Sequence, residues 1–330
     1  MKIYVTAQHT PYIDSFFPDH LMERLHALGE VNRNPYDRSM TREELEQVLP
    51  DTDILVTTWG TPQVDAAMLE KAPHLKMLAH GAGTVAHIAS EAFWEKGIPV
   101  LSANPIMART VAEATLAYIL AGMRRIPQAD HCIRGGGWMK LPGRYSLLDS
   151  SVGLIGFGAV ARNLMPLLAP FHCQVLVYDP YLPEDALQEW PFARQCTFEE
   201  AMSQRVVSVH AAQMPETYHM VNAAALSLMP DHALLVNTAR GSLVDTEALI
   251  AELKTGRISA VLDVYEKEGA GQQPKELLEL QDQCILQPHI AALSDWHLTE
   301  GIVEDIERFC RNEPMKLQVT LRQYRFMTQE

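Results

Sequence analysis

Three side chains in the second half of the chain have the types needed for redox chemistry on an anionic carbonyl compound. Arg240, Glu268 and His289 supply a cation, a carboxylate and an imidazole in this order. An Arg binds a carboxylate by a two-pronged contact that Lys cannot reproduce. A His beside a carboxylate is held in one orientation with its protonated form stabilised, so it can give a proton to a carbonyl oxygen and take it back. Taken alone, Arg240 also suits a surface ion pair, and one of 13 histidines suits a structural role.

The three residues follow three apolar segments of strand type. Residues 237–241 (Asn-Thr-Ala-Arg-Gly), 263–268 (Asp-Val-Tyr-Glu-Lys-Glu) and 287–290 (Gln-Pro-His-Ile) each come directly after such a segment. In doubly wound α/β folds, ligands bind at the carboxyl ends of the strands. We therefore expect the three tips to converge on one ligand.

A glycine motif near the middle of the chain predicts a dinucleotide site. The apolar run 152–155 leads into Gly156-Phe157-Gly158-Ala159-Val160-Ala161, and a helical pattern follows. Gly156 permits the tight turn, Gly158 lets the backbone approach a pyrophosphate, and the small Ala161 packs helix on strand. A second strand, 174–178, ends at Asp179, which can accept hydrogen bonds from the ribose hydroxyls and would repel a 2′-phosphate. The motif alone is weak evidence for a nucleotide site, because Gly-rich turns between strand and helix also serve packing. Together with the flanking strand, the helix and Asp179, it predicts NAD as the cofactor.

Composition and charge narrow the classes of partner. The 330 residues are enough for two domains, and 47% of them are hydrophobic. A net charge of −14 disfavours nucleic acid and anionic membranes. Five scattered cysteines without Cys-x-x-Cys spacing indicate a reducing compartment and no zinc site, and we expect no metal. The early polar residues do not fit a signal peptide and no apolar run is long enough to span a bilayer, so we expect a cytoplasmic protein.

The alternation of strand and helix patterns predicts an α/β fold with two doubly wound parallel sheets. The first sheet is expected from strands at 3–7, 53–58, 75–80 and 99–102, with helices at 19–28, 41–49, 64–71 and 90–96. The second is expected from strands at 152–155, 174–178, 205–209, 233–238, 258–264 and 284–286. A long helix at 109–125 bridges the domains, a Gly-rich loop follows at 135–137, and a helix at 293–310 returns to the first domain.

Domain boundaries follow from these patterns. We expect residues 1–101 and 297–330 to form a substrate-binding domain and residues 102–296 to form the NAD-binding domain, with a ligand cleft between them. The helix at 109–125 is apolar on more faces than one domain needs, which predicts a homodimer.

The ordered motifs resemble those of the D-isomer-specific 2-hydroxyacid dehydrogenases over nearly the full length. The blocks are 152–161 with Asp179, 207–217, 237–244, 263–268 and 288–290, with shorter matches at 81–84 and 111–113. The resemblance implies a Rossmann-like nucleotide domain and a flavodoxin-like substrate domain. One departure is Thr84-Val85-Ala86-His87, where the family often has Thr-Asp-Asn, so contacts around that loop differ.

The resemblance also implies roles for individual residues. Arg240 would bind the substrate carboxylate and carbonyl, His289 would be the acid/base, and Glu268 would stabilise its protonated form. Backbone N–H groups of Ala82 and Gly83 would bind the substrate carboxylate. The adenosine half of NAD would contact Ala159, Val160 and Asp179, and the nicotinamide half would contact Ala211, Ala212, Thr217, Thr238, Ala239 and Asp263.

These roles imply reversible reduction of a small 2-oxo acid to its D-2-hydroxy acid, as in glyoxylate and hydroxypyruvate reductases. Two alternatives stay open. One is an NAD(H)-responsive scaffold or corepressor without significant turnover, disfavoured because long disordered extensions are absent from the sequence. The other is a phosphorylated substrate, disfavoured because no Arg/Lys cluster beyond Arg240 is evident for a second anionic group.

Overall fold

The computed structural model describes residues 1–138, 144–148, 150–292 and 295–328, which divide into two compact units. Unit 1 contains Met1–Met107 and the C-terminal segment from residue 293, and unit 2 contains Ala108–Ala292. From the sequence, the boundaries were expected after residues 101 and 296. The difference at the first boundary arises because the long helix begins at Asn104 and its first turn packs with unit 1 through Ile106 and Met107.

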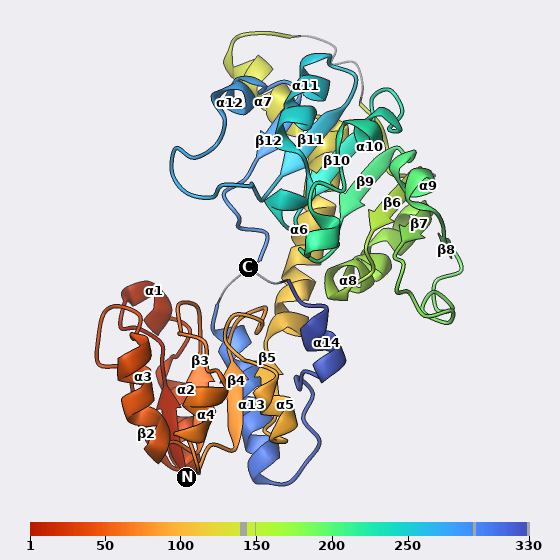
Figure 1. Cartoon of the computed structure of the whole chain (residues 1–330). Helices are drawn as coiled ribbons and strands as arrows, with labels where there is room; N and C mark the ends of the chain where they lie inside the picture. Colours follow the sequence, from red (N-terminus) through yellow and green to blue (C-terminus); the bar gives the residue numbers. More distant parts are fainter. Residues whose placement is uncertain (139–143, 149, 293–294, 329–330) are drawn as a thin grey trace. The chain divides into compact units, whose positions relative to one another are not determined.

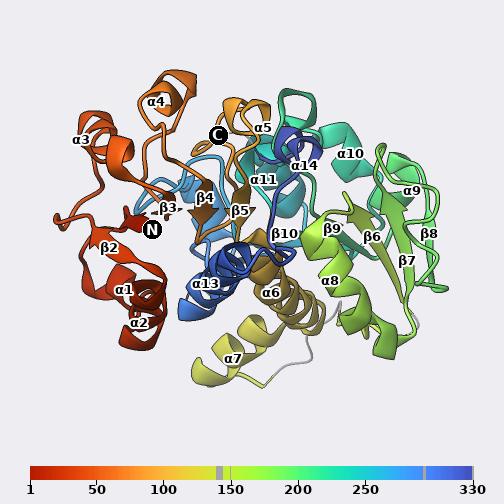
Figure 2. The same ribbon diagram turned by 90° about the horizontal axis from the view of Figure 1, so that it is seen from below.

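Unit 1 contains a parallel sheet of order β2-β1-β3-β4-β5 within the described residues (Figure 1). Its strands are β1 (Lys2–Val5), β2 (Glu30–Arg33), β3 (Ile54–Thr57), β4 (Met77–His80) and β5 (Val100–Ser102). Its helices are α1 (Pro11–Asp14), α2 (Asp19–Leu28), α3 (Arg42–Val48), α4 (Ala66–Glu70), α5 (Ala92–Glu95), α13 (Trp296–Cys310) and α14 (Leu321–Arg325). Figure 2 shows α3, α4 and α5 on one face of the sheet and α1, α2 and α13 on the other.

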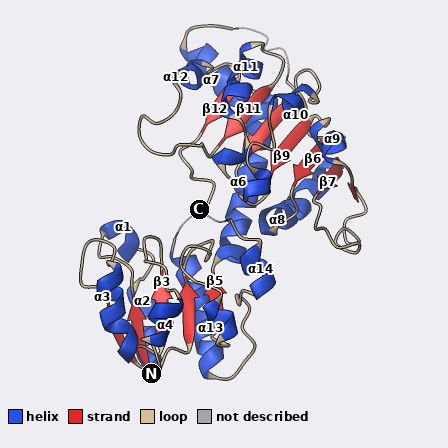
Figure 3. Ribbon diagram, in the orientation of Figure 1, coloured by secondary structure: helices blue, strands red, loops and turns tan. Residues whose placement is uncertain are grey.

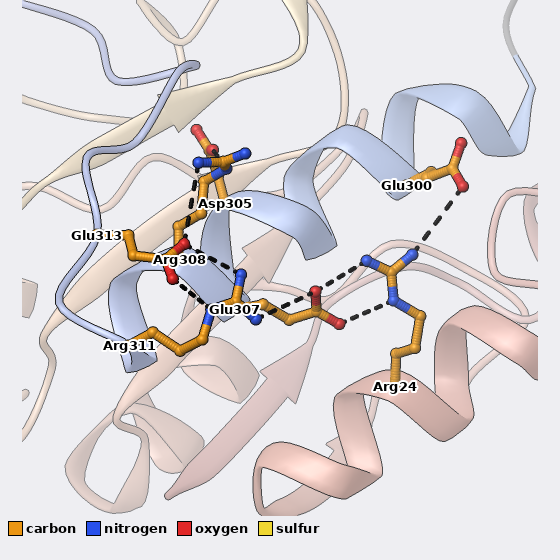
Figure 4. A network of polar contacts seen from close by, with 7 residues as sticks. All are labelled: Arg24, Glu300, Asp305, Glu307, Arg308, Arg311 and Glu313. Carbon is orange, nitrogen blue, oxygen red and sulfur yellow. Dashed lines mark hydrogen bonds and ion pairs between the residues drawn. The ribbon is translucent and has the colours of Figure 1, made fainter.

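The C-terminal helix α13 completes the core of unit 1. Leu298, Ile302 and Ile306 are buried against residues of β1, β3 and β4. A polar network on the outside ties α13 to α2, with the Arg24 guanidinium donating to both carboxylate oxygens of Glu307 at 2.8 and 3.0 Å (Figure 4). The helix was expected over 293–310; residues 293 and 294 lie outside the described part, and Asp295 caps the helix at its amino end.

Unit 2 contains a parallel sheet of order β12-β11-β10-β9-β6-β7-β8 within the described residues (Figure 3). Its strands are β6 (Ser151–Ile155), β7 (Gln174–Tyr178), β8 (Ala193–Gln195), β9 (Val206–Val209), β10 (Leu234–Asn237), β11 (Ser259–Leu262) and β12 (Cys284–Leu286). Its helices are α6 (Asn104–Arg124), which begins in unit 1, α7 (Ile126–Arg134), α8 (Ala159–Leu168), α9 (Phe198–Met202), α10 (Ala223–Ser227), α11 (Thr246–Lys254) and α12 (Lys275–Glu279). The predicted fold class, two α/β domains with parallel sheets, is confirmed.

Two strands, β2 and β8, and three helices, α1, α7 and α14, were not expected from the sequence. The strands β2 and β8 lie at sheet edges and are largely polar, so they lack the apolar run by which the other strands were found. The four-residue α1 and the five-residue α14 are too short for a periodic pattern, and α7 is separated from α6 by Arg125 in a left-handed conformation with φ 53°.

The long helix α6 contradicts the expectation that no apolar run is long enough to span a bilayer. By length and composition alone, this helix is long and apolar enough to cross a membrane. Part of its apolar surface is used within the protein, because Ala112, Ile119 and Met123 belong to the core of unit 2. The helix also carries Arg109, Glu113 and Arg124.

Candidate active site

The turn between β6 and α8 has the geometry that a dinucleotide requires. Gly156 has a φ of +93°, and a Cβ at this position would lie 2.7 Å from the backbone nitrogen of Ala211. Gly158 is the N-cap of α8, has no side-chain cap, and would direct a Cβ into open space. Backbone N–H groups at the start of α8 are therefore accessible to a phosphate, which the helix dipole favours. These residues fit NAD.

Asp179 follows β7 at the position expected for ribose recognition. One carboxylate oxygen accepts a hydrogen bond from the Phe157 amide and the other from the Tyr181 amide, each at 2.9 Å. Each oxygen keeps a further lone pair for a ribose hydroxyl. The structure thus adds a second function for Asp179, which is to fix the glycine turn before Ala159 and Val160 begin α8.

The predicted nicotinamide residues after β9 form one tight loop. The Thr217 hydroxyl donates to the carbonyl of Ala212 at 2.8 Å and accepts from the Met214 amide at 2.9 Å. The backbone of Ala211 lies against Gly156. The Thr217 side chain therefore shapes the loop that carries Ala211 and Ala212.

Arg240 lies on a loop that a neighbouring Asn holds in shape. The Asn237 side chain accepts from the Ala239 amide at 3.0 Å and donates to the Arg240 carbonyl at 2.9 Å. Arg240 Nη1 donates to the Ala239 carbonyl at 2.8 Å. A Cβ at Gly241 would lie 1.8 Å from the carbonyl carbon of Tyr265, so the loops after β10 and β11 approach too closely for any larger residue. Asn237 was not among the predicted site residues, although it lies in the quoted motif.

His289 and Glu268 are in direct contact. His289 Nδ1 lies 2.7 Å from Glu268 Oε2, with side chains that are 45% and 41% exposed. His289 has a φ of +55°, an uncommon conformation for a non-glycine residue, and such strain is concentrated at functional sites. With Nδ1 bonded to the carboxylate, Nε2 is the nitrogen that can reach a substrate oxygen. The pair has the geometry of an acid/base and the group that orients it.

Asp263 holds the loop that carries His289. Its carboxylate is fully buried and accepts from the amides of Ile290 and Ala291 at 2.9 and 3.0 Å, and the His289 amide donates to the Asp263 carbonyl at 2.8 Å. The sequence predicted a nicotinamide contact for Asp263. That contact stays a prediction; the structure shows in addition that its carboxylate fixes the strained His289 backbone, a function that no spacing in the sequence indicates.

Ala82 and Gly83 lie in unit 1, in the loop after β4. Ser102 Oγ donates to the Gly83 carbonyl and lies 3.4 Å from the Ala82 carbonyl, and among the residues that the structure describes neither the Ala82 nor the Gly83 amide has a protein acceptor. Gly83 is partly exposed, so its amide can donate to a carboxylate, whereas Ala82 is fully buried in this structure. Ser102 was not predicted, and its signal is its place at the end of the adjacent strand β5.

Burial keeps several groups around these loops uncharged. Burial lowers the pKa of His210, which follows β9 and bonds Ser208, to about 4. Burial raises the pKa of Tyr265 to about 12, and its hydroxyl donates to the Gln287 carbonyl at 2.8 Å, which joins the ends of β11 and β12. Among the described residues, no group of three His, Cys, Asp or Glu could hold a metal ion.

Comparison with known proteins identifies the family. Residues 116–291 match the family described as "D-isomer specific 2-hydroxyacid dehydrogenase, NAD binding domain". The glyoxylate reductase of Thermococcus litoralis is 31% identical over 92% of this chain and 90% of its own length. The chain belongs to the D-isomer-specific 2-hydroxyacid dehydrogenases. Unit 2 is accordingly the NAD-binding domain of such a dehydrogenase, and the predicted cofactor, NAD, is confirmed.

Other members of this dehydrogenase family differ in length or substrate. The D-3-phosphoglycerate dehydrogenase of Methanocaldococcus jannaschii is 32% identical over 87% of this chain, which spans about half (55%) of that protein. The D-lactate dehydrogenase of Aquifex aeolicus, solved with NAD and lactic acid, superposes with a TM-score of 0.72 at 25% identity, over 95% of this chain and 96% of that one.

Proposed function

We propose that this chain reduces a small, unphosphorylated 2-oxo acid such as glyoxylate or hydroxypyruvate to its D-2-hydroxy acid, with NADH as the reductant. The contact of 2.7 Å between His289 and Glu268 at the carboxyl ends of the NAD-domain strands carries this proposal. This pair supplies a proton donor at the same edge of the sheet as the glycine turn between β6 and α8, and α/β folds bind their ligands at this edge.

The roles of the protein groups follow from their chemistry. When bound, NADH supplies the hydride for C2 of the 2-oxo acid. His289 gives the proton on Nε2 to the carbonyl oxygen, and Glu268 stabilises the imidazolium before this transfer. Arg240 binds the substrate carboxylate and stabilises charge that develops on the carbonyl oxygen. Unit 1 would be the substrate domain and would add the amides of Ala82 and Gly83.

The preference for an unphosphorylated acid has two supports. One is the glyoxylate reductase of T. litoralis, a relative with an unphosphorylated substrate that is 31% identical over 92% of this chain. The net charge of −14 also repels anions, so a doubly charged phosphorylated acid would need more local cations than a simple keto acid.

A spectrophotometric screen of NADH and NADPH oxidation against 2-oxo acids tests the proposal. We expect turnover with NADH on glyoxylate or hydroxypyruvate and little on phosphohydroxypyruvate. His289→Gln should abolish turnover and leave NADH binding, measured by fluorescence, unchanged. No turnover on any acid, together with NADH-dependent capture of a protein partner, would refute the proposal in favour of a scaffold.

We further propose that the enzyme is a cytoplasmic homodimer. Helix α7 supports the dimer, because Ile126 and Ile133 on it are each more than half exposed. The five free thiols are compatible with a reducing compartment. Light scattering that gave the mass of a single chain would contradict the dimer.

A further inference from the structure

Two hydroxyl groups on one face of α6 are hydrogen-bonded to the loops that carry the predicted catalytic residues. Thr115 Oγ1 lies 3.0 Å from Thr238 Oγ1, on the loop of Arg240. The Tyr118 hydroxyl lies 3.3 Å from Asp263 Oδ1, on the carboxylate that holds the loop of His289. Residues three apart on a helix share a face.

The packing of α6 on the sheet explains why these two positions reach the carboxyl ends of the strands. A Cβ at Gly122 would lie 2.8 Å from Leu234 side-chain atoms, so the helix passes close to the start of β10 at this residue. Gly122 and Thr115 are about 10 Å apart along a helix, and Leu234 and Thr238 are about 13 Å apart along a strand. The helix therefore runs antiparallel to β10, and its earlier turns meet the strand tips.

The bond of Thr115 sets the direction of the Thr238 hydroxyl. Thr115 is fully buried and donates its hydroxyl proton to the Val111 carbonyl at 2.7 Å. A hydroxyl has one proton, so Thr238 must be the donor in the bond between the two threonines. The Thr238 oxygen then presents lone pairs to a bound ligand, which suits the amide N–H₂ group of a nicotinamide and not its carbonyl.

The bond of Tyr118 completes the set of donors around Asp263. The buried carboxylate accepts two backbone amides from the loop after His289, and the tyrosine hydroxyl adds a third donor from α6. Burial raises the pKa of Tyr118 to about 12, so the phenol keeps its proton at physiological pH. A buried carboxylate without enough donors is costly, and a looser Asp263 would free the strained His289 backbone.

We propose that Thr115 and Tyr118 are positioning residues of the reaction, Thr115 through Thr238 at the nicotinamide and Tyr118 through Asp263 at His289. This inference rests on the proposed reductase function. It predicts different kinetic effects for the two residues, because one acts on cofactor binding and the other on proton transfer.

The test compares variants that remove each hydroxyl in the full-length enzyme. Tyr118→Phe should lower kcat about tenfold with an unchanged KM for NADH. Thr115→Val should raise the KM for NADH about tenfold with a smaller effect on kcat, and Thr115→Ser, which restores the hydroxyl, should return the KM to within about twofold of wild type. Matched controls are Tyr324→Phe, which removes a bond to the Ala89 carbonyl, and Thr52→Val, which removes a bond to the Val48 carbonyl.

The outcomes separate this inference from the proposed function. A wild-type enzyme without turnover would refute the function. An active wild type with Tyr118→Phe and Thr115→Val kinetics equal to those of the controls would overturn the positioning roles alone. If part of a variant preparation is unfolded, the concentration of folded enzyme is measured by titrating its NADH-binding sites, and kcat is calculated from that concentration. A kcat for Tyr118→Phe that then equals the wild-type value would also overturn the positioning role of Tyr118.

Discussion

Replacing Glu268 with Gln removes the negative charge beside His289 and keeps a hydrogen-bond acceptor in its place. The amide oxygen of Gln can still accept from His289 Nδ1, so the ring orientation and the free Nε2 should persist. The variant therefore isolates the electrostatic contribution of the carboxylate to proton transfer. We expect a lower kcat for 2-oxo acid reduction at neutral pH.

The size of the effect follows from the distance and the exposure of the pair. Two unit charges about 4 Å apart interact by about 1 kcal/mol in water and about 4 kcal/mol at an effective dielectric constant of about 20. The pair is bonded at 2.7 Å but is 45% and 41% exposed, so solvent screening places the value near the lower limit. A loss of about 1–2 kcal/mol of imidazolium stabilisation lowers kcat about five- to thirtyfold.

Steady-state oxidation of saturating NADH by glyoxylate, at fixed pH and ionic strength, measures this effect. Glu266→Gln is the matched control, because Glu266 lies on the same loop but contacts Thr246 and His219. The KM for NADH should be unchanged in both variants. A kcat for Glu268→Gln within twofold of wild type would refute the assignment of Glu268 as the partner that activates His289.

Two further changes test the cofactor site and the packing of unit 1. Asp179→Asn removes the charge that repels a 2′-phosphate and keeps one acceptor oxygen, for either the Phe157 or the Tyr181 amide, so the ratio of kcat/KM for NADH over NADPH should fall about tenfold. Burial lowers the pKa of His80 from 6.5 to about 3, so its neutral form stabilises the fold fully above pH 6.5 and this stability is lost as the pH falls toward 3. His80→Gln should remove up to about 1.4 kcal/mol per pH unit from the pH dependence of the unfolding free energy in that window.

Each of these predictions has a control on the same unit. Asp185→Asn changes the net charge of unit 2 equally at an exposed position and should leave the NADH preference intact. For His80, urea unfolding across the pH range should be compared with His26→Gln at the exposed position 26 of α2. If the unfolding free energy changes with pH equally in His80→Gln and in the wild type, the His80 imidazole is not buried in its neutral form.

The buried strands were predictable because parallel strands covered on both faces have continuous apolar runs. Strands β7 and β12 and helix α2 have the predicted bounds, and the other predicted strands differ by one or two residues at their ends. The edge strands β2 and β8 were missed because they are largely polar, whereas the edge strands β5 and β12 have apolar runs that predicted them.

The predicted catalytic loops could be found because each is a short segment directly after an apolar strand. Contacts between loops were not predictable, because they depend on side-chain directions that spacing does not give. The approach of Gly241 to Tyr265 is an example, and the bonds that Asn237 makes within its own turn were missed for the same reason. Asp263 shows the same limit, since its position in the motif gave no sign that its carboxylate holds the His289 loop.

The strained backbone of His289 links these observations. A φ of +55° costs energy in a residue with a side chain, so the surrounding structure must hold it. Asp263 does so through its carbonyl to the His289 amide and through its buried carboxylate to the next two amides. Tyr118 in turn supplies a donor to that carboxylate from α6. The His289 backbone is therefore held by Asp263 after β11, and Asp263 is held in turn by Tyr118 on α6. Substitutions in α6, far from His289 in sequence, should change proton transfer without touching the substrate.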